Sequence, residues 1–395
     1  MTYALDGIKV LDLTRVLAGP YATMILGDLG ADIIKIEIPK KGDDSRNFGP
    51  YLNNESAYFM SINRNKRSMT LNLKEEKGKK ILLELVKEAD VIVENFRPGT
   101  MEKLGLGFEV LKKKNPKIIY AAASGFGHSG PYSKRAAYDA VVQAMGGIMS
   151  ITGQKDGKLT RVGPSIGDIT AGLFTSIGIL TALVNRNKTG KGQKIDVAML
   201  DCQVAILENA IARYVVTKDI PKPMGNRHTS IVPFEPFETK DGEIIIAAGN
   251  DVLWSKLCDA IGKSELVNDE RFKTNPLRNE NYDILRAIIA EPFKNKTTNE
   301  WLGILNDKGV PNGPINTIDK VIKDPQVLER KMIVEVEHPK AGKLKVPGIP
   351  IKMSDTPGEI RTPSPLLGEH TYEILEEMLG YNKEKIDKLR DENIF

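Results

Sequence analysis

One acidic residue stands where it could perform covalent chemistry. Asp168 lies in the stretch VGPSIGDITAGLFTSIGILTALVNR (162–186), just after Pro164 and Gly167, and apolar residues follow it at helical spacing. This pattern predicts a long buried helix that begins near Asp168. A helix start presents unpaired N–H groups and a positive dipole end, so we expect the carboxylate to stay ionised and to be able to act as an oxygen nucleophile. From this stretch alone, helix capping is the simpler explanation.

Other catalytic patterns are missing from the sequence. The four histidines, His128, His228, His338 and His370, are far apart, so no metal site is predicted. The sequence has no GxSxG elbow, no catalytic-cysteine signature and no Walker-type phosphate loop. Residues 125–130 (GFGHSG) match GxGxxG, but Pro131 follows at once and no helix opens there, which favours a plain glycine-rich loop. These observations favour an α/β enzyme for a small anionic ligand without naming the reaction.

Alternating strand and helix patterns organise the first half of the chain. Ile8–Leu13 and Ile33–Glu37 read as strands around a helix at 18–29 that has Pro20 in its first turn, and such a β-α-β unit implies a parallel sheet. Further strands are predicted at 68–73, 91–94, 118–124 and 194–197. The turn 95–99 (NFRPG) follows a strand end, which is where ligands bind in open α/β sheets.

The second half is predicted to hold a smaller domain. Pro221–Pro236 is rich in proline and reads as a linker, and 237–248 reads as a hairpin that turns at Asp241-Gly242. Helical patterns follow at 253–261, 283–293 and 299–308, and two more helices are expected after the stretch 365–371.

Composition limits the possible partners. The chain has 395 residues and a formal net charge of +4, which is too small an excess to indicate nucleic acid as a partner. No apolar run is judged long enough to span a membrane, and the N-terminal residues lack a signal-peptide layout. Cys202 and Cys258 are the only cysteines, so no disulfide framework is expected and a reducing, cytoplasmic location fits.

Several stretches together resemble the class III CoA-transferase family (CaiB/BaiF type), the group of formyl-CoA transferase and carnitine CoA-transferase. They are Gly7–Gly30, Ala31–Glu37, Asn63–Ser68, Val93–Gly107, Gly130–Met145, Gly163–Gly172, Thr189–Asp201, Gly225–Phe237 and Pro365–Thr371. Each is weak alone, but the ordered set spans nearly the whole chain. The N-terminal run and Gly42–Pro50 (GDDSRNFGP) are most similar to the branch that moves CoA between dicarboxylates.

The resemblance implies a fold and an assembly. The fold class would be α/β, with a Rossmann-like large domain containing a parallel sheet (1–220 and the return segment 326–395) and a smaller α+β domain with linkers (221–325). Two chains would interlock into an obligate homodimer.

The resemblance also implies the chemistry. Asp168 would be the catalytic aspartate, and its carboxylate would attack an acyl-CoA thioester to give a mixed anhydride and then an aspartyl-CoA thioester. CoA and acyl-CoA would be substrates, and no permanently bound cofactor or metal would be needed.

The positions that match the family's CoA contacts are Leu17, Ala18, Leu71, Asn72, Lys74, Asn95, Phe96, Arg97, Lys103, Arg135, Ala137 and Tyr138. Two departures matter. Ile38 stands where some members have an arginine on the nucleotide, so Lys40 or Lys41 is expected to replace it. Leu17 stands where formyl-CoA transferase has a polar residue facing the thioester, which argues against formyl transfer.

A short dicarboxylate acceptor would need a cation for its second carboxylate, and an arginine fork suits that task. The candidates are Arg15, Arg46, Arg64 and Arg67, with Arg46 as first choice; the alternative for Arg46 is a surface pair with Asp43 or Asp44.

Two other functions stay open. The first is acyl-CoA racemisation or epimerisation. The racemase relatives carry a histidine where Tyr138 precedes Asp139, and a tyrosine is a poor base at neutral pH unless another base such as His128 substitutes. The second is a non-catalytic CoA-binding protein on the same fold.

Overall fold

The structure is a computed structural model that describes residues 2–395. Its contacts divide the chain into two compact units. The first unit runs to Met149 and resumes over Arg161–Lys218 and Pro325–Phe395. The second comprises Asp219–Asp324 and the short segment Ser150–Thr160, which lies in a region that the sequence had left in the large domain.

The first unit is built on a six-stranded sheet in which every strand pairing is parallel. Its strands, in spatial order, are β5 (Lys66–Thr70), β2 (Asp32–Glu37), β1 (Lys9–Asp12), β6 (Val91–Glu94), β7 (Ile119–Ser124) and β8 (Lys194–Ala198). Residues of the inner strands are almost all buried, as expected when both faces of a parallel sheet are covered. The predicted α/β fold with a parallel sheet is confirmed.

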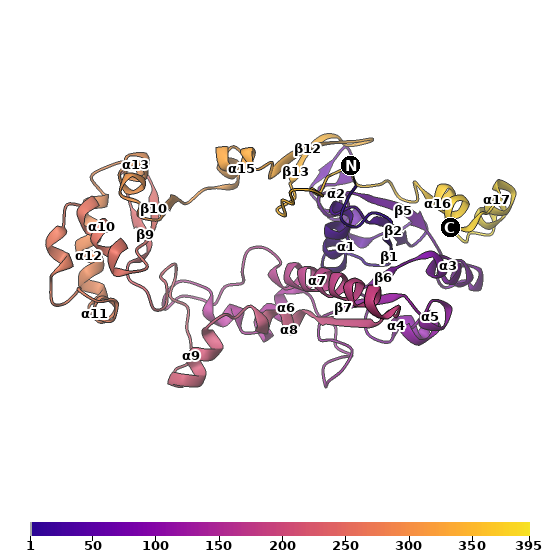
Figure 1. The fold of residues 1–395 in the computed structure, drawn as a ribbon, viewed down its shortest axis with the longest axis horizontal. Helices are drawn as coiled ribbons and strands as arrows, with labels where there is room; N and C mark the ends of the chain where they lie inside the picture. Colours follow the sequence, from indigo (N-terminus) through magenta and orange to yellow (C-terminus); the bar gives the residue numbers. More distant parts are fainter. Residues whose placement is uncertain (1) are drawn as a thin grey trace. The chain divides into compact units, whose positions relative to one another are not determined.

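Helices cover both faces of this sheet (Figure 1). Val10 and Ile33 point to the face where α1 (Ala18–Asp28) and α7 (Ile166–Thr189) pack. Leu11 and Ile34, one position along each strand, point to the opposite face. The opposite face is covered by α3 (Glu76–Glu88), α5 (Phe108–Lys114), α16 (Thr371–Leu379) and α17 (Lys383–Asp391). The chain's last helices therefore complete the core that its first strands begin.

The first unit also contains shorter helices and two small two-stranded sheets, β3–β4 and β12–β13. They are β3 (Tyr51–Leu52), β4 (Glu55–Ser56), α2 (Ala57–Ile62), α4 (Thr100–Lys103), α6 (Asp139–Met145), α8 (Met199–Ala205), α9 (Ala210–Thr217), α15 (Pro325–Glu329), β12 (Ile333–His338) and β13 (Gly342–Pro347).

The second unit has its own core around an antiparallel sheet of β9 (Phe234–Glu238), β10 (Glu243–Ala247) and β11 (Asn312–Pro314). The hairpin between β9 and β10 turns at the residues that the sequence indicated, whereas the three-residue β11 contains Gly313 and Pro314 and carries no strand pattern. Its helices are α10 (Asp251–Ala260), α11 (Asn275–Glu280), α12 (Tyr282–Phe293), α13 (Thr298–Lys308) and α14 (Ile318–Val321).

Helix α7 corrects one statement made from the sequence. It has 24 residues with a mean hydropathy of 1.6 over its most apolar window, so it is long and apolar enough to cross a membrane, and among residues 2–395 it is the one helix that is. Half of that window is buried inside the unit, against α1 and the sheet. A core helix of a globular domain has the same properties, so α7 is weak evidence for a membrane.

Candidate active site

The catalytic candidate Asp168 is the third residue of α7, beside the start of α1. The two helices approach closely at Gly172, where an added Cβ would lie 2.8 Å from the carbonyl oxygen of Ala18. One turn before this contact, the carboxylate of Asp168 accepts a backbone hydrogen bond from Ala18, the first residue of α1. Two glycines make this geometry possible, because a Cβ at Gly19 would also collide with Thr14.

The protonation state of Asp168 differs from the expectation. Burial, and then the negative charge of Asp139, raise the pKa of its carboxyl to about 7, although the Ala18 hydrogen bond acts in the opposite direction. A carboxyl with this pKa is protonated in about half of the molecules at neutral pH. The expectation that a helix start keeps Asp168 ionised is therefore wrong, because burial and a second acid outweigh the helix N–H groups.

The second acid, Asp139, also holds the backbone segment that leads into Asp168. Its Oδ1 accepts the N–H of Gly167 at 2.8 Å, and its Oδ2 accepts Nε2 of Gln143 at 2.8 Å. Gln143 in turn accepts the N–H of Val162 at 2.8 Å. Asp139 and Gln143 are both buried. Side chains of α6 thus bind the backbone on the N-terminal side of Asp168.

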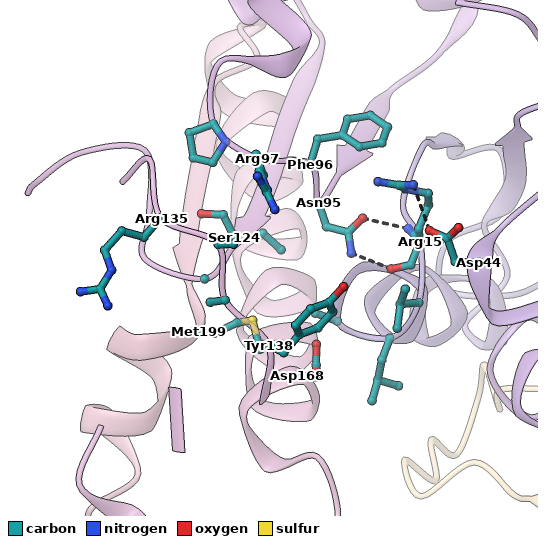
Figure 2. A pocket seen from close by; sticks show the side chains of 18 residues that line it. Arg15, Asp44, Asn95, Phe96, Arg97, Ser124, Arg135, Tyr138, Asp168 and Met199 are labelled. Carbon is teal, nitrogen blue, oxygen red and sulfur yellow. Dashed lines mark hydrogen bonds and ion pairs between the residues drawn. The ribbon is translucent and has the colours of Figure 1, made fainter. Parts of the chain in front are cut away.

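A cavity of about 200 Å³ opens beside Asp168 at the carboxyl ends of the strands (Figure 2). The predicted residues that line it are Arg15, Leu17, Ala18, Asn95, Phe96, Arg97, Arg135, Ala137 and Tyr138. Residues that the sequence did not single out also line it, among them Val16, Asp44, Ser124 and Met199. Ser124 ends β7 and Met199 begins α8, so a strand-end rule applied to every strand would have found them.

A larger cavity of about 670 Å³ shares Arg15 and Phe96 with the first, so the two are adjacent. It is lined by three further predicted residues, Leu71, Asn72 and Lys74. The turn that holds Ile38, Lys40 and Lys41 forms another part of its wall. Lys103 is not placed as expected. It is exposed on α4 and lines neither cavity, because α4 and the residue after it present Thr100 and Leu104 to the larger one.

The structure also corrects the prediction for Arg46, because its guanidinium is already paired with Glu37. Nε lies 2.8 Å and Nη2 2.7 Å from the two carboxylate oxygens of Glu37, and the guanidinium also stacks on the ring of Phe59 at 3.8 Å. Its side chain is 13% exposed and that of Glu37 is 1% exposed. Arg46 lines neither cavity, so it is neither the substrate anchor nor a surface partner of Asp43 or Asp44.

The other three arginine candidates differ in whether they line the cavities. Arg64 and Arg67 form ion pairs with Asp28 and Asp32 at 2.7 and 2.6 Å, away from the cavities. Arg15 lines both cavities, with its side chain 38% exposed and paired with Asp44 at 3.0 Å.

Asn95 holds the backbone of Arg15 on both sides, accepting its N–H at 2.8 Å and donating to its carbonyl at 2.7 Å (Figure 2). Arg15 is therefore the one of these four arginines that lines the cavities.

The alternative base for racemisation is not at the cavity. The Nδ1 atom of His128 lies 3.0 Å from the Lys194 amine, and His128 lines neither cavity. Burial and the charge of Lys194 lower the pKa of His128. Tyr138 is 77% exposed on the cavity wall, in the place where racemase relatives were expected to carry a histidine.

Comparison with known proteins identifies the family. The model of CoA-transferase family III matches residues 5–371. The chain is 44% identical to succinyl-CoA:glutarate CoA-transferase of Homo sapiens, covering 98% of this chain and 88% of that protein. It is 45% identical to acetyl-CoA:oxalate CoA-transferase of Acetobacter aceti, covering 92% and 93%.

A solved structure shows the same fold. A CaiB/BaiF family protein from Brucella suis superposes with a TM-score of 0.85 at 42% identity, covering 96% of this chain and all of that one. The resemblance read from the sequence is thus confirmed. The chain belongs to CoA-transferase family III and is a CoA-transferase.

Proposed function

We propose that this CoA-transferase moves CoA from an acyl-CoA thioester to a short dicarboxylic acid through covalent intermediates on Asp168. The observation that supports the proposal is the half-buried Asp168 carboxylate, which accepts a hydrogen bond from the Ala18 N–H beside a cavity with arginines on its wall. The two curated relatives are named for the dicarboxylic acids glutarate and oxalate, which supports the substrate class.

In the first half-reaction, a carboxylate oxygen of Asp168 attacks the thioester carbonyl carbon. The C–S bond breaks, an acyl-aspartyl anhydride forms and CoA leaves as a thiolate. The thiolate attacks the aspartyl carbonyl of the anhydride, which releases the donor acid and leaves an aspartyl-CoA thioester.

In the second half-reaction, the acceptor carboxylate attacks this thioester and expels the thiolate again. The thiolate then attacks the acceptor's acyl carbon, which gives the new acyl-CoA and frees Asp168. The N–H of Ala18, which donates to the Asp168 carboxylate, would stabilise the oxyanions that form on the aspartyl carbon. A carboxylate that its surroundings stabilise poorly is also the stronger nucleophile, which suits the raised pKa of Asp168.

The larger cavity is proposed to hold the nucleotide end of CoA. Lys40, Lys41 and Lys74 lie on its wall and supply cations for phosphates, with Lys40 or Lys41 replacing the arginine that Ile38 displaces. Arg97 lines the smaller cavity, and among residues 2–395 it forms no ion pair, so it remains available to an anion (Figure 2). Arg15 lines both cavities and is proposed to bind the second carboxylate of the acid.

We further propose an obligate homodimer. Large apolar side chains are exposed along α7 and α9, including Ile177, Val184, Val215 and Val216, and a second chain would cover such surfaces. Light scattering at low concentration tests this, and a folded monomer of 43.6 kDa would contradict it. The two cysteines, Cys202 and Cys258, are buried free thiols, which suits the reducing cytoplasm as location.

The decisive experiment traps the intermediate. Wild-type protein is incubated with an acyl-CoA and hydroxylamine, and mass spectrometry should find a hydroxamate on the peptide that contains Asp168. Asp168→Asn should bind CoA, form no adduct and transfer nothing. A coupled assay over a panel of acyl-CoAs and free acids identifies the substrates. Turnover near wild type by the Asn variant would contradict the mechanism.

A further inference from the structure

The loop before α1 contains a residue in a strained conformation. Val16 has φ = 67°, in the left-handed region that β-branched residues avoid because their Cβ collides with the backbone. It lies between Arg15 and Leu17 on the wall of the cavity, and two residues later Ala18 presents its N–H to Asp168. Such strain persists only where the surrounding structure over-determines it.

Asp43 provides the contacts that hold Val16. Its Oδ1 accepts the N–H of Val16 at 3.0 Å, together with the N–H and hydroxyl of Ser45 at 2.9 and 2.8 Å. Its Oδ2 lies 2.8 Å from the amine of Lys35, and both side chains are fully buried.

Lys35 holds the other side of the same turn, because its amine also donates to the carbonyl of Thr14 at 2.9 Å. Although burial acts against it, the positive charge of Lys35 holds the pKa of Asp43 well below its usual range. The buried ion pair therefore stays charged at any working pH, and it binds the backbone on both sides of Arg15.

We propose that Asp43, supported by Lys35, is a positioning residue of this active site that keeps Val16 left-handed and so directs the first N–H of α1 at the Asp168 carboxylate. The proposal rests on the proposed covalent role of Asp168. Without Asp43, Val16 would relax to a negative φ, the peptide groups at 16–18 would rotate, and the N–H would turn away from the reacting carbon.

This proposal predicts a specific rescue, because glycine adopts a positive φ as readily as a negative one, whereas alanine keeps the Cβ that causes the strain. Asp43→Ala, which unlike an asparagine variant leaves no side-chain oxygen to accept the N–H of Val16, should lower kcat on the order of 100-fold, as expected when a catalytic group is displaced by about 1 Å. Binding of unreactive CoA should change less than about threefold. Adding Val16→Gly should recover kcat about tenfold, since the active conformation then has no strain to overcome.

Two controls separate positioning from general effects. Asp43→Ala with Val16→Ala removes the same methyl groups of Val16 but keeps a Cβ, so it should recover less than about twofold. Asp43→Ala with Asn54→Gly introduces glycine at another left-handed residue (φ = 65°), exposed on the β3–β4 turn, and should recover nothing. Equal recovery by all three double variants, or kcat near wild type in Asp43→Ala alone, would overturn the proposal.

If Asp43→Ala does not fold because Lys35 is left buried without its carboxylate, the same comparison is made in Lys35→Met with Asp43→Ala, which removes both charges together. The hydroxylamine adduct of the wild type separates the two ideas. Its absence from Asp168 would refute the proposed function, whereas its presence without a glycine-specific rescue would refute only the role of Asp43.

Discussion

The Oδ1 atom of Asp139 accepts the N–H of Gly167 at 2.8 Å, so a buried acid from α6 takes a hydrogen bond of the very helix start that carries Asp168. The N-terminus of α7, which should stabilise one negative charge, therefore lies beside two carboxyl groups, those of Asp168 and Asp139. An added Cβ at Gly167 would lie 3.1 Å from that oxygen and 2.7 Å from Val142, so glycine allows the contact. Burial and the neighbouring charge together raise the pKa of Asp168, so its carboxylate is more basic but is only partly ionised at neutral pH.

Asp139→Asn should move the acid limb of the kcat/KM–pH profile to lower pH. Burial and Asp139 raise the pKa of Asp168 to about 7, and the nucleophile must be ionised to react. Removing the neighbouring charge lowers that pKa, so the variant should keep a larger fraction of its activity at pH 6. The profile is measured with saturating acceptor between pH 5 and 9.

Wild type and Asp139→Asn share the other titratable and charged groups near Asp168. These are Tyr58 on α2 and the cavity residues Arg15, Arg97, Arg135 and Tyr138. Asp201→Asn, at an exposed acid in the first turn of α8, is the matched control for loss of one acid, and it should leave the midpoint unchanged. A rate loss in Asp139→Asn without any shift of the midpoint would assign Asp139 a purely structural role.

Asp168→Asn should stabilise the fold, and more so at high pH. The pKa of Asp168 is about 7 in the folded protein against an ordinary 3.8, so between these values the folded chain holds a proton that the unfolded chain releases. Wild-type stability is therefore lost as pH rises from about 4 to about 7. The variant should gain on the order of 1–3 kcal/mol at pH 8 and little at pH 4, measured by denaturant unfolding. An equal gain at both values would contradict the raised pKa.

Arg46→Ala should damage stability rather than acceptor choice. It leaves the buried carboxylate of Glu37 without its bidentate partner, which costs about 3–5 kcal/mol of unfolding free energy. Glu37→Gln together with Arg46→Met removes both charges and should recover part of that loss. Kinetics on the folded fraction should show the same ratio of KM values for dicarboxylates and monocarboxylates as wild type, and an altered ratio would restore Arg46 as a substrate residue.

Arg15→Ala should raise the KM for a short dicarboxylate about tenfold or more and leave that for a monocarboxylate nearly unchanged. The reason is that Arg15 borders both cavities and pairs with Asp44 at the surface, so a substrate carboxylate can replace that pair. Arg135→Ala removes another cation from the same cavity wall and should affect acyl-CoA instead. An equal loss for both classes of acid in Arg15→Ala would show that Arg15 binds CoA.

Gly172→Ala should lower the free energy of unfolding by about 1–3 kcal/mol and reduce kcat, because its Cβ would press on the Ala18 carbonyl and push α1 from α7. Gly303→Ala in α13 is the matched control. No atom lies within 4 Å of a Cβ there, so alanine should stabilise the helix by about 0.5–1 kcal/mol. Thermal unfolding and turnover of both variants check this, and a neutral Gly172→Ala would contradict the tight crossing.

Much of the framework could be predicted from local sequence. The strand and helix periods around Ile8–Glu37 indicate a parallel sheet, and Pro164 and Gly167 mark the start of the helix that carries Asp168. These signals are local because backbone conformation depends mainly on neighbouring residues. Motifs in order along the chain were sufficient to indicate the CoA-transferase family.

What each charged side chain does was decided only by the tertiary structure. The guanidinium of Arg46 is paired with Glu37, and burial and then the charge of Asp139 oppose the ionisation of Asp168. Neither fact has a signal in the neighbouring residues of the sequence. Pairing and protonation depend on which groups are buried together, and burial depends on how distant segments pack. The sequence by itself therefore determined the strands and helices of the parallel sheet and the place of Asp168 at a helix start. The pKa of Asp168, its N–H partner and the arginine that lines both cavities were decided by the packed fold, because each depends on residues that are distant in the sequence.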